Sequence, residues 1–545
     1  MVHATDEIPV YDVLIIGAGF AGLHSLHRVR SDGFNAIVIE AAPDVGGAWY
    51  WNRYPGARCD VESLVYSYSF SPILDAEWKW SERYSARDEI CEYLRFAADR
   101  LDLRKDIRFN SRIKSAIYDK QARLWEFETE DGDRYKARHF ISAAGPITTP
   151  IYPDIPGIKS FKGTLIHTAR WPQEEPDFSG KRVGIIGTGS SAVQAIPIIA
   201  EQCEHLTVFI RTANFYSPAC NRPLTDADYE WWEENRELTR ERMRECIRWG
   251  GGDIMLPDEV NDTALQKASD FSPERRAEIY ETRYANGGGV VGWAFGDAMV
   301  DPEVNQEAGD FLRSKIATVV EDPDTVEKLT PRGFAYGTKR CTVGTDYYEA
   351  YNRENVDLVD VKSNPIEYVE DSFVVVGGEK IELDYLICAS GFDALTGALT
   401  GMEVRGEDGQ LLKDVWQDGP KTELGISVHG FPNLYMVGGP GSPSVLTNVV
   451  MTNEIQVDWI GDLIKYVEDN DFTRCEAKQE AQEQWTDTVN SLVEDNLWGT
   501  SNSWYVGANV PGKPRVILAY VGGVKSYREH CDQESQNGYP GFALS

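Results

Sequence analysis

Two glycine-rich turns, each set between an apolar strand and a helix, constrain the fold of this 545-residue chain more than any other feature. The first turn follows residues 11–16 (YDVLII), opens a helical stretch at 20–30 and leads to a second apolar run at 36–40 (AIVIE). The second turn follows KRVGII, which begins at residue 181, and leads through a helix to LTVFIR at 206–211. A strand, a tight turn, a helix and a second strand make up a mononucleotide-binding unit. The sequence therefore predicts an α/β fold with two Rossmann-like dinucleotide-binding domains.

The first turn reads Gly17-Ala18-Gly19-Phe20-Ala21-Gly22, and Glu40 ends the strand that follows the helix. The first glycine allows the turn, the second lets a pyrophosphate approach the backbone, and the third lets helix and strand pack closely. The helix N-terminus offers free N–H groups to the phosphates. Because a carboxylate at the position of Glu40 accepts hydrogen bonds from a ribose and repels a 2′-phosphate, this unit is predicted to bind FAD or NAD rather than NADP.

The second turn reads Gly187-Thr188-Gly189-Ser190-Ser191-Ala192, with alanine in place of the third glycine. Its second strand ends in Arg211-Thr212 instead of an acid. A guanidinium there can pair with a 2′-phosphate in bidentate fashion, which predicts an NADPH site; the alternative is a solvated arginine at a strand end. Two such sites in one chain imply that NADPH reduces a flavin. The reduced flavin could then reduce a disulfide, reduce a quinone or react with O₂.

The rest of the chain divides around these two units. The stretches 125–145 and 372–391 each predict a hairpin followed by a buried strand that ends in Ala-x-Gly. Residues 225–330 are rich in Glu, Arg, Trp and Tyr at helical spacing, and Ser272-Pro273-Glu274 is a good helix start. We therefore expect an FAD-binding domain in two parts (1–146 and 390–545), an NADP-binding domain in two parts (147–224 and 332–389), and a helical insertion in the NADP domain (225–331).

Composition excludes several classes of function. The formal charge of −33 repels nucleic acid and anionic membrane surfaces. No apolar run reaches the ~20 residues of a membrane span, and residues 1–9 lack the apolar core of a signal peptide. The nine cysteines are odd in number and form no CxxC pair, and His24 and His27 have no further ligands at metal-binding spacing. We expect a cytoplasmic monomer with reduced thiols and without a metal.

Further motifs select among the possible fates of the flavin. A disulfide reductase of this architecture needs a close cysteine pair after the first unit, where this chain has only Cys59. Instead, residues 46–60 and 161–172 resemble the signatures of type I Baeyer–Villiger monooxygenases, and those of the phenylacetone and steroid enzymes most closely. The second segment has the pattern Phe161-x-Gly163-x-x-x-His167-x-x-x-Trp171-Pro, whereas N- and S-oxygenating relatives usually carry Tyr or Phe in place of this Trp. Residues 337–340, 389–393 and 502–505 also look like family segments, although Ser390 stands where many members have Thr.

This resemblance implies a reaction. NADPH reduces FAD, O₂ forms a C4a-peroxyflavin, and the peroxide attacks a ketone to give an ester or lactone; sulfides are further expected substrates. By resemblance, Arg340 stabilises the peroxide and the tetrahedral oxyanion, and Asp60 pairs with Arg340. Phosphate binding is the alternative role for Arg340. Phe161, Gly163, His167 and Trp171 are expected to couple domain movement rather than to transfer protons.

The resemblance also implies a set of cofactor contacts and a substrate loop. The loop at 439–448 follows the apolar run 434–438 and should present Ser444, Val445 and Leu446 to a small apolar ketone; a glycine-rich turn that touches no substrate is the alternative. For Trp49, Tyr50 and Trp51, expected around the flavin, ordinary aromatic core is the alternative. The expected cofactor contacts are Gly17, Gly19, Phe20, Gly22, Glu40, Ala48, Trp49, Tyr50, Trp51, Arg58, Cys59, Asp60, Tyr66, Ile113, Thr188, Gly189, Ser190, Ser191, Ala192, Gln194, Arg211, Thr212, Lys339, Arg340, Val449 and Trp504.

Two other functions remain open at this point. The first is a flavin monooxygenase that oxygenates nitrogen or sulfur, which product analysis would distinguish from ketone oxidation. The second is a flavin-binding redox sensor or oxidase, which would consume NADPH with stoichiometric peroxide and no oxygenated product.

Overall fold

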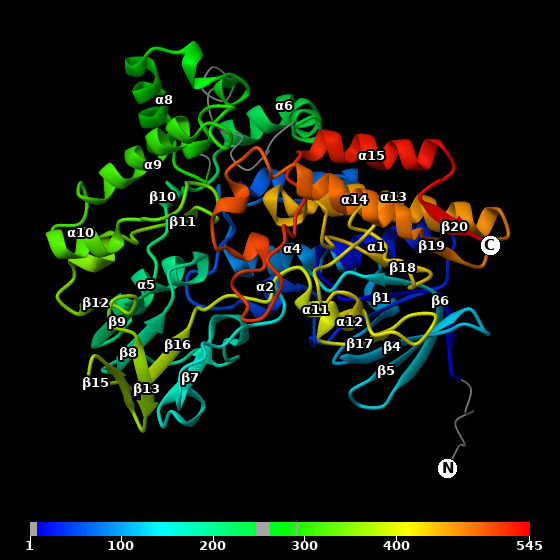
Figure 1. The fold of residues 1–545 in the computed structure, drawn as a ribbon, viewed down its shortest axis with the longest axis horizontal. Coiled ribbons are helices and arrows are strands. Elements are labelled where there is room, and N and C mark those ends of the chain that lie inside the picture. The colour runs from blue at the N-terminus through cyan, green and yellow to red at the C-terminus, as the bar shows by residue number, and fades with distance from the viewer. Residues whose placement is uncertain (1–7, 247–261, 290) are drawn as a thin grey trace.

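The computed structural model of the chain describes residues 8–246, 262–289 and 291–545. Two sheets lie in two lobes, and a group of helices sits above the sheet of the left-hand lobe in the view shown (Figure 1). The expectation of no leader falls mostly on residues 1–7, which lie outside the described residues. Within the described part of the chain, no helix is both long and apolar enough to cross a membrane.

The right-hand lobe of Figure 1 is built on a mixed sheet with the order β17-β4-β5-β6-β1-β2-β3, in which β18 also pairs with β6. The strands β2, β1, β6 and β18 are parallel, so their carboxyl ends lie at one edge of the sheet, beside the first glycine-rich turn. The strands span Val10–Ile16 (β1), Ala36–Ile39 (β2), Ile107–Arg108 (β3), Ile113–Asp119 (β4), Leu124–Thr129 (β5), Arg134–Ser142 (β6), Glu403–Arg405 (β17) and Leu434–Met436 (β18).

The left-hand lobe contains a wholly parallel sheet with the order β12-β9-β8-β16-β7. A three-stranded antiparallel meander precedes β16, at the position of the second predicted hairpin. The parallel strands of both sheets, with helices between them, confirm the expected α/β class. The strands span Thr164–His167 (β7), Arg182–Ile186 (β8), His205–Ile210 (β9), Val356–Asp360 (β12), Ile366–Glu370 (β13), Phe373–Val376 (β14), Glu379–Glu382 (β15) and Tyr385–Cys388 (β16).

The helical group lies between β10 (Tyr216–Pro218) and β11 (Thr342–Gly344), which pair in parallel and bring the two ends of the insertion together. Its helices begin at side-chain caps that the sequence favours. Ser272 accepts the N–H of Arg275, and Thr225 forms a capping box with Asp228. The helices span Asp226–Arg244 (α6), Pro273–Asn286 (α8), Pro302–Ile316 (α9) and Pro323–Leu329 (α10).

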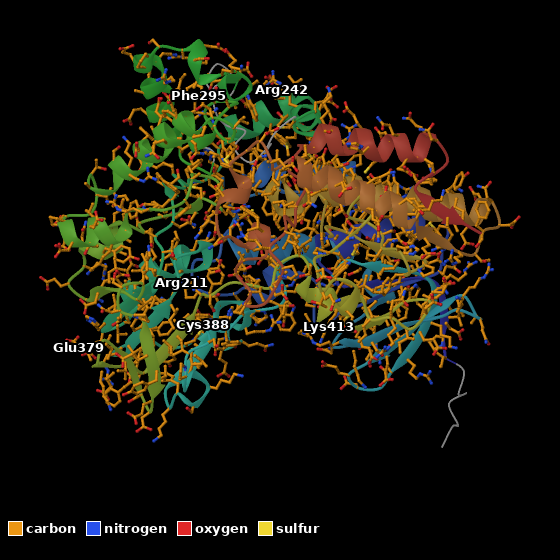
Figure 2. All side chains as sticks on the ribbon, viewed as in Figure 1. Arg211, Arg242, Phe295, Glu379, Cys388 and Lys413 are labelled. Carbon is orange, nitrogen blue, oxygen red and sulfur yellow. The ribbon has the colours of Figure 1, made fainter. Side chains whose placement is uncertain are left out.

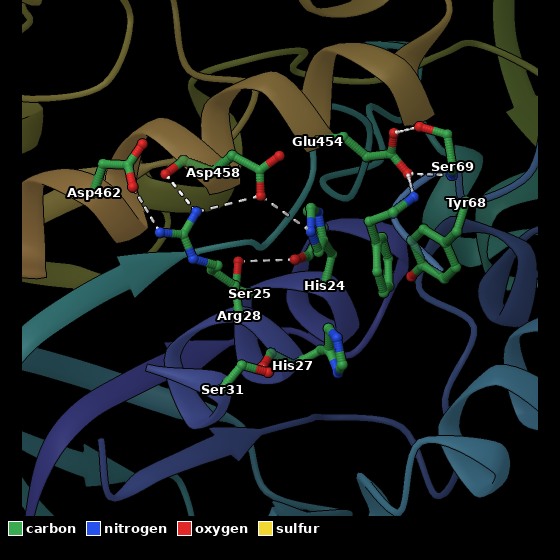
Figure 3. Close-up of polar contacts among 12 residues, drawn as sticks. His24, Ser25, His27, Arg28, Ser31, Tyr68, Ser69, Glu454, Asp458 and Asp462 are labelled. Atoms are coloured by element: carbon green, nitrogen blue, oxygen red, sulfur yellow. Dashed lines mark hydrogen bonds and ion pairs between the residues drawn. The ribbon is translucent and has the colours of Figure 1, made fainter. Parts of the chain in front are cut away.

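Helix α1 (Phe20–Ser31) packs along α13 (Val449–Asp469), and polar contacts fix the pair (Figure 3). Arg28 donates to the carbonyl of Asp458 at 2.9 Å and to the carboxylate of Asp462 at 2.7 Å. His24 Nε2 lies 3.5 Å from the Asp458 carboxylate, a partner that no sequence spacing indicated. These contacts tie the middle and the C-terminal half of α1 to α13.

The other helices and strands complete the two lobes. They span Ala48–Trp51 (α2), Pro72–Glu77 (α3), Arg87–Arg100 (α4), Ser190–Gln202 (α5), Gly397–Thr400 (α11), Leu412–Val415 (α12), Gln479–Ser491 (α14), Val524–Gln536 (α15), Cys475–Ala477 (β19) and Phe542–Leu544 (β20).

The cysteines are free thiols. Seven are buried, Cys246 is half-buried and Cys220 is exposed. Among the described residues, no group of His, Cys, Asp and Glu side chains is arranged to hold a metal ion.

Candidate active site

The first glycine-rich turn is a close backbone approach that leaves no room for side chains. A Cβ at Gly22 would lie 1.7 Å from the carbonyl oxygen of Gly17, and one at Gly17 would lie 2.6 Å from that of Ala143. A Cβ at Gly19 would lie 3.3 Å from the Cα of Gly47. The first turn of α1 carries no acidic residue, so its N–H groups are open to an anion. This cradle fits a pyrophosphate.

Glu40 lies at the end of β2 with its side chain turned back onto the turn. It is 4% exposed and accepts the N–H groups of Ala18 and Ala42, each at 2.6 Å. Burial raises the pKa of Glu40, and the two N–H donors oppose that rise. The carboxylate therefore uses part of its acceptor capacity on the backbone and keeps the rest for a ribose hydroxyl.

Aromatic side chains surround the edge of the sheet next to this cradle. Trp49 Nε1 donates to the Tyr66 hydroxyl at 3.1 Å, and Phe20 packs edge-on against the Tyr66 ring. Tyr50 is buried in the same short helix, α2, and Ile113 is buried at the start of β4. Ala48 and Trp51 begin and end α2. The residues expected around a flavin thus come from four segments of one lobe: α1, α2, the turn that ends at Tyr66 and the start of β4.

Arg340 and Asp60 form a bidentate ion pair across the two lobes. Nε and one terminal nitrogen of Arg340 donate to the two carboxylate oxygens of Asp60, both at 2.8 Å. The other terminal nitrogen donates to the carbonyl oxygen of Val445 at 3.0 Å. Burial alone would raise the pKa of Asp60, but the charge of Arg340 outweighs it and holds this pKa below its usual value. Arg340 stays charged because Asp60 raises its pKa.

Two groups beside this pair are held neutral. Burial raises the pKa of the Cys59 thiol, which excludes it as a nucleophile at neutral pH. Burial likewise raises the pKa of Tyr505 to about 12, against the opposing charge of Arg340. Tyr505 follows Trp504 and is 3% exposed. The sequence placed Tyr505 in a segment that resembles the family, but it did not indicate that Tyr505 lies beside Arg340.

The second glycine-rich turn is as crowded as the first at its first glycine, where a Cβ at Gly187 would lie 2.4 Å from the carbonyl oxygen of Ala389, but it is open at its second glycine. A Cβ at Gly189 would meet nothing within 4 Å. Thr188 donates to the carbonyl of Thr212 at 2.7 Å, which ties the turn to the end of β9. Ser190 and Ser191 start α5, and Ala192 is buried in it.

Gln194 of α5 connects the NADP-type unit to the other lobe. Its side chain donates to the carbonyl of Arg58 at 3.1 Å and accepts the Tyr54 hydroxyl at 2.9 Å. The Arg58 guanidinium itself pairs with Glu82. Arg58 therefore lies at the junction of the lobes with its charge already partnered.

Three cations meet at the ends of β9 and β12. Arg211 is exposed directly after β9 and is labelled in Figure 2. Val361 donates to the carbonyl of Ile210 at 2.8 Å, so Lys362 comes one residue past the last contact between the strands. Burial lowers the pKa of Lys339, and the charges of Arg211 and Lys362 lower it further. Within the described residues none of the three forms an ion pair. The sequence did not indicate Lys362, because only the parallel pairing of β12 with β9 brings it beside Arg211.

The Phe161–Trp171 segment lies where the second sheet meets the linkers between the lobes. His167 ends β7, accepts the N–H of Ala169 through Nδ1 at 3.0 Å and donates through Nε2 to the carbonyl of Ile151 at 3.2 Å. Burial lowers the pKa of His167 to about 4, so the ring is neutral and fully used in backbone contacts. Phe161 and Trp171 are buried, and a Cβ at Gly163 would lie 2.5 Å from the carbonyl of Asp384.

The loop after β18 lies against Arg340. Ser444–Leu446 forms a short 3-10 turn, with Ser444 at a φ of 42°. The Val445 carbonyl accepts from Arg340, while the Val445 side chain and Val449 pack on the apolar core of the first lobe. Trp504 packs on the same core.

Comparison with known proteins places the chain in a family. Residues 11–221 match the flavin-binding monooxygenase-like family model. Cyclohexanone 1,2-monooxygenase of Acinetobacter sp is 39% identical over 98% of this chain and 96% of its own length. Phenazine N-monooxygenase of Lysobacter antibioticus is 37% identical over 98% and 97%. A solved structure of oxidized steroid monooxygenase bound to NADP superposes with a TM-score of 0.91 at 45% identity, covering 98% of this chain and 99% of that one. The chain belongs to the flavin-binding monooxygenase-like family, which confirms the resemblance that its motifs indicate.

Proposed function

We propose that this protein is a Baeyer–Villiger monooxygenase that uses FAD, NADPH and O₂ to convert an apolar ketone into an ester or lactone. One observation carries the proposal above the others. A permanently charged guanidinium, fixed by Asp60 and by the Val445 carbonyl, lies where the two nucleotide-binding lobes meet. A fixed cation at this point would suit a reaction in which negative charge develops on the oxygen atoms of the reacting groups.

The residues present fit the two cofactors. The closed cradle at Gly17–Gly22, with Glu40 behind it, fits the pyrophosphate and ribose of FAD. The turn at Gly187–Ala192, which is open at Gly189 and has Arg211, Lys339 and Lys362 beyond it, fits the dinucleotide and 2′-phosphate of NADPH. When bound, the reduced flavin supplies the activation of O₂.

The side chains of this chain perform the remaining tasks. Asp60 fixes the plane of the Arg340 guanidinium, which then needs no reorganisation as negative charge develops on the substrate oxygen. Because burial holds Cys59 and Tyr505 neutral, neither of them competes with a substrate anion for this guanidinium. His167 is neutral and bound to backbone groups on both sides, so we assign it with Phe161, Gly163 and Trp171 to the connection between the lobes rather than to proton transfer.

The substrate class follows from the loop that supports Arg340. Val445 and Leu446 are apolar, and Tyr66, Trp504 and Tyr505 belong to the same apolar cluster. A ketone has one polar atom, so the rest of its binding must come from buried apolar area, at about 25 cal/mol per Å². We therefore propose apolar ketones as substrates, in preference to charged keto acids, with sulfides as a secondary class.

We also propose that the protein is a monomer and that it is cytoplasmic. Light scattering after size-exclusion chromatography tests the monomeric state.

A second candidate is N-oxygenation, which the 37% identity to a phenazine N-monooxygenase supports. The two functions share both cofactors and differ in the substrate atom that is oxygenated. Trp171, in place of the Tyr or Phe usual in N-oxygenating relatives, favours the ketone.

The test is a panel of apolar ketones, charged keto acids, sulfides and phenazines, assayed with the holoenzyme for NADPH-dependent products. Ester formation from apolar ketones supports the proposal, and N-oxide formation alone overturns it.

Arg340→Ala should keep FAD but lose about 100- to 1000-fold in ester formation, the range for removing one oxyanion donor. Deleting Ser444 and Val445 should change the ratio of kcat/KM for phenylacetone to that for larger cyclic ketones, and an unchanged ratio would remove this loop from the pocket.

A further inference from the structure

The segment that reads the 2′-phosphate in the proposed NADPH site continues directly into a contact with Arg340. Arg211 and Thr212 follow β9, and Asn214 comes two residues later. The side-chain amide of Asn214 donates from Nδ2 to the main-chain carbonyl oxygen of Arg340 at 2.8 Å. The phosphate-reading segment and the cation at the reaction centre are thus joined by one hydrogen bond.

The orientation of the Asn214 amide is fixed by a second contact. Its Oδ1 accepts the N–H of Phe215 at 3.0 Å, which leaves Nδ2 pointing at Arg340. The main-chain carbonyl oxygen of the next residue, Phe215, accepts the N–H of Thr342 at 2.8 Å. The parallel pairing of β10 with β11 begins at the residue after Phe215. The Asn214 side chain therefore extends this pairing by one position, up to Arg340.

Lys339 provides a second connection to the same phosphate site. It precedes Arg340 in the chain, and the charges of Arg211 and Lys362 act on it. A 2′-phosphate that draws Arg211 and Lys339 together would pull on Arg340 from both sides, through the Asn214 amide and through the peptide bond after Lys339.

We infer that Asn214 is a positioning residue that transmits occupancy of the 2′-phosphate site to the Arg340 guanidinium. This inference rests on the proposed function, and it adds that the 2′-phosphate serves the coupling of NADPH oxidation to ester formation as well as affinity. Loss of the Asn214 donor should release the Arg340 backbone while leaving Arg211 and Lys339 free to bind the phosphate.

The experiment measures peroxide and ester formed per NADPH oxidised in the holoenzyme with a good ketone substrate. Asn214→Asp keeps the size and the acceptor of the N–H of Phe215 but removes the donor to Arg340. We expect the peroxide share to rise about three-fold or more and ester formation per NADPH to fall, with the KM for NADPH changed less than two-fold. Asn214→His, which can donate again, should recover part of the coupling.

Thr342→Val is the matched control. The Thr342 hydroxyl donates to the carbonyl of Phe215 at 3.0 Å, within the same pairing but without contact to the Arg340 carbonyl. Thr342→Val should therefore leave the ester formed per NADPH unchanged if the contact of Asn214 with the Arg340 carbonyl maintains the coupling. Equal peroxide yields in wild type and Asn214→Asp, or an equal loss of coupling in Thr342→Val, would overturn the inference. Wild-type protein that forms no ester would instead refute the proposed function itself.

Discussion

At the end of β2, the Glu40 carboxylate is 4% exposed and accepts two backbone N–H groups at 2.6 Å. At the equivalent end of β9, Arg211 is exposed and forms no ion pair within the described residues. Both strands follow a glycine-rich turn and a helix, so the two sites share one scaffold. The residue at the end of the strand makes the two ligand sites different. The first site is closed and internally satisfied, which suits a cofactor that stays. The second keeps its charge unpaired for a cofactor that comes and goes.

The glycine turns give the sharpest way to break this comparison. Gly22→Ala puts a Cβ within 1.7 Å of the Gly17 carbonyl, so we expect little or no soluble, FAD-containing protein. Gly189→Ala meets nothing within 4 Å and should fold with FAD bound, while losing NADPH affinity because the methyl group blocks the pyrophosphate. Expression yield and flavin absorbance measure the folding and FAD content of both variants, and titration with NADPH measures the affinity of Gly189→Ala. Equal flavin content in the two variants would contradict the contrast between the crowded position of Gly22 and the open position of Gly189.

The exposed arginine provides the next largest effect. Arg211→Ala removes a charge-assisted contact to the 2′-phosphate, worth roughly 1.5–3 kcal/mol, or about 10- to 100-fold in NADPH affinity. NADH affinity should change far less, because NADH lacks that phosphate. Titration of the oxidised holoenzyme with both cofactors is the measurement, and a parallel loss for the two would remove Arg211 from phosphate recognition.

Lys362 should contribute a smaller part of the same preference. It is exposed, and Asp360 accepts its backbone N–H at 2.8 Å, so a carboxylate beside it offsets part of its charge. Lys362→Ala should weaken NADPH binding about two- to five-fold, the worth of an exposed pair, without affecting NADH. Lys380→Ala on the meander, where Lys380 pairs with Glu370, is the control for net charge. Equal effects of the two variants would mean that Lys362 acts only through overall charge.

A second buried carboxylate, Glu423, shows what the backbone donors do for Glu40. Glu423 is 5% exposed and its Oε2 has no partner among the described residues. Burial, with a contribution from Glu534, raises the pKa of Glu423 to about 8. The folded protein therefore holds a proton that the unfolded chain releases above pH ~4.5, and this group's contribution to stability falls as the pH rises from there to about 8.

Glu423→Gln removes that dependence and should be the smallest of these effects. Relative to wild type, its Tm should rise by about 1–3 °C between pH 6 and pH 8.5. Thermal unfolding followed by flavin fluorescence at both values measures the difference. A constant difference between variant and wild type would show that Glu423 is already ionised in the folded protein.

Much of this organisation could be predicted from local pattern. The strand, turn and helix at each fingerprint, the cap at Ser272 and the strand-end residues Glu40 and Arg211 depend on nearby sequence, and the structure has each element there. Contacts set by long-range register could not be predicted. Lys362 meets Arg211 only because β12 pairs with β9, and His24 meets Asp458 only because α13 packs on α1. The Asn214 contact with Arg340 likewise depends on how the two ends of the insertion come together.

The most direct test of the central claim is the fate of ¹⁸O₂ in a reaction of holoenzyme, NADPH and an apolar ketone such as phenylacetone. The account predicts one ¹⁸O atom in the bridging position of the ester, with NADPH consumed close to one for one, and strongly reduced ester with NADH at the same concentration. Unlabelled ester, labelled N-oxide from an amine without any ester from ketones, or peroxide equal to the NADPH consumed would contradict it.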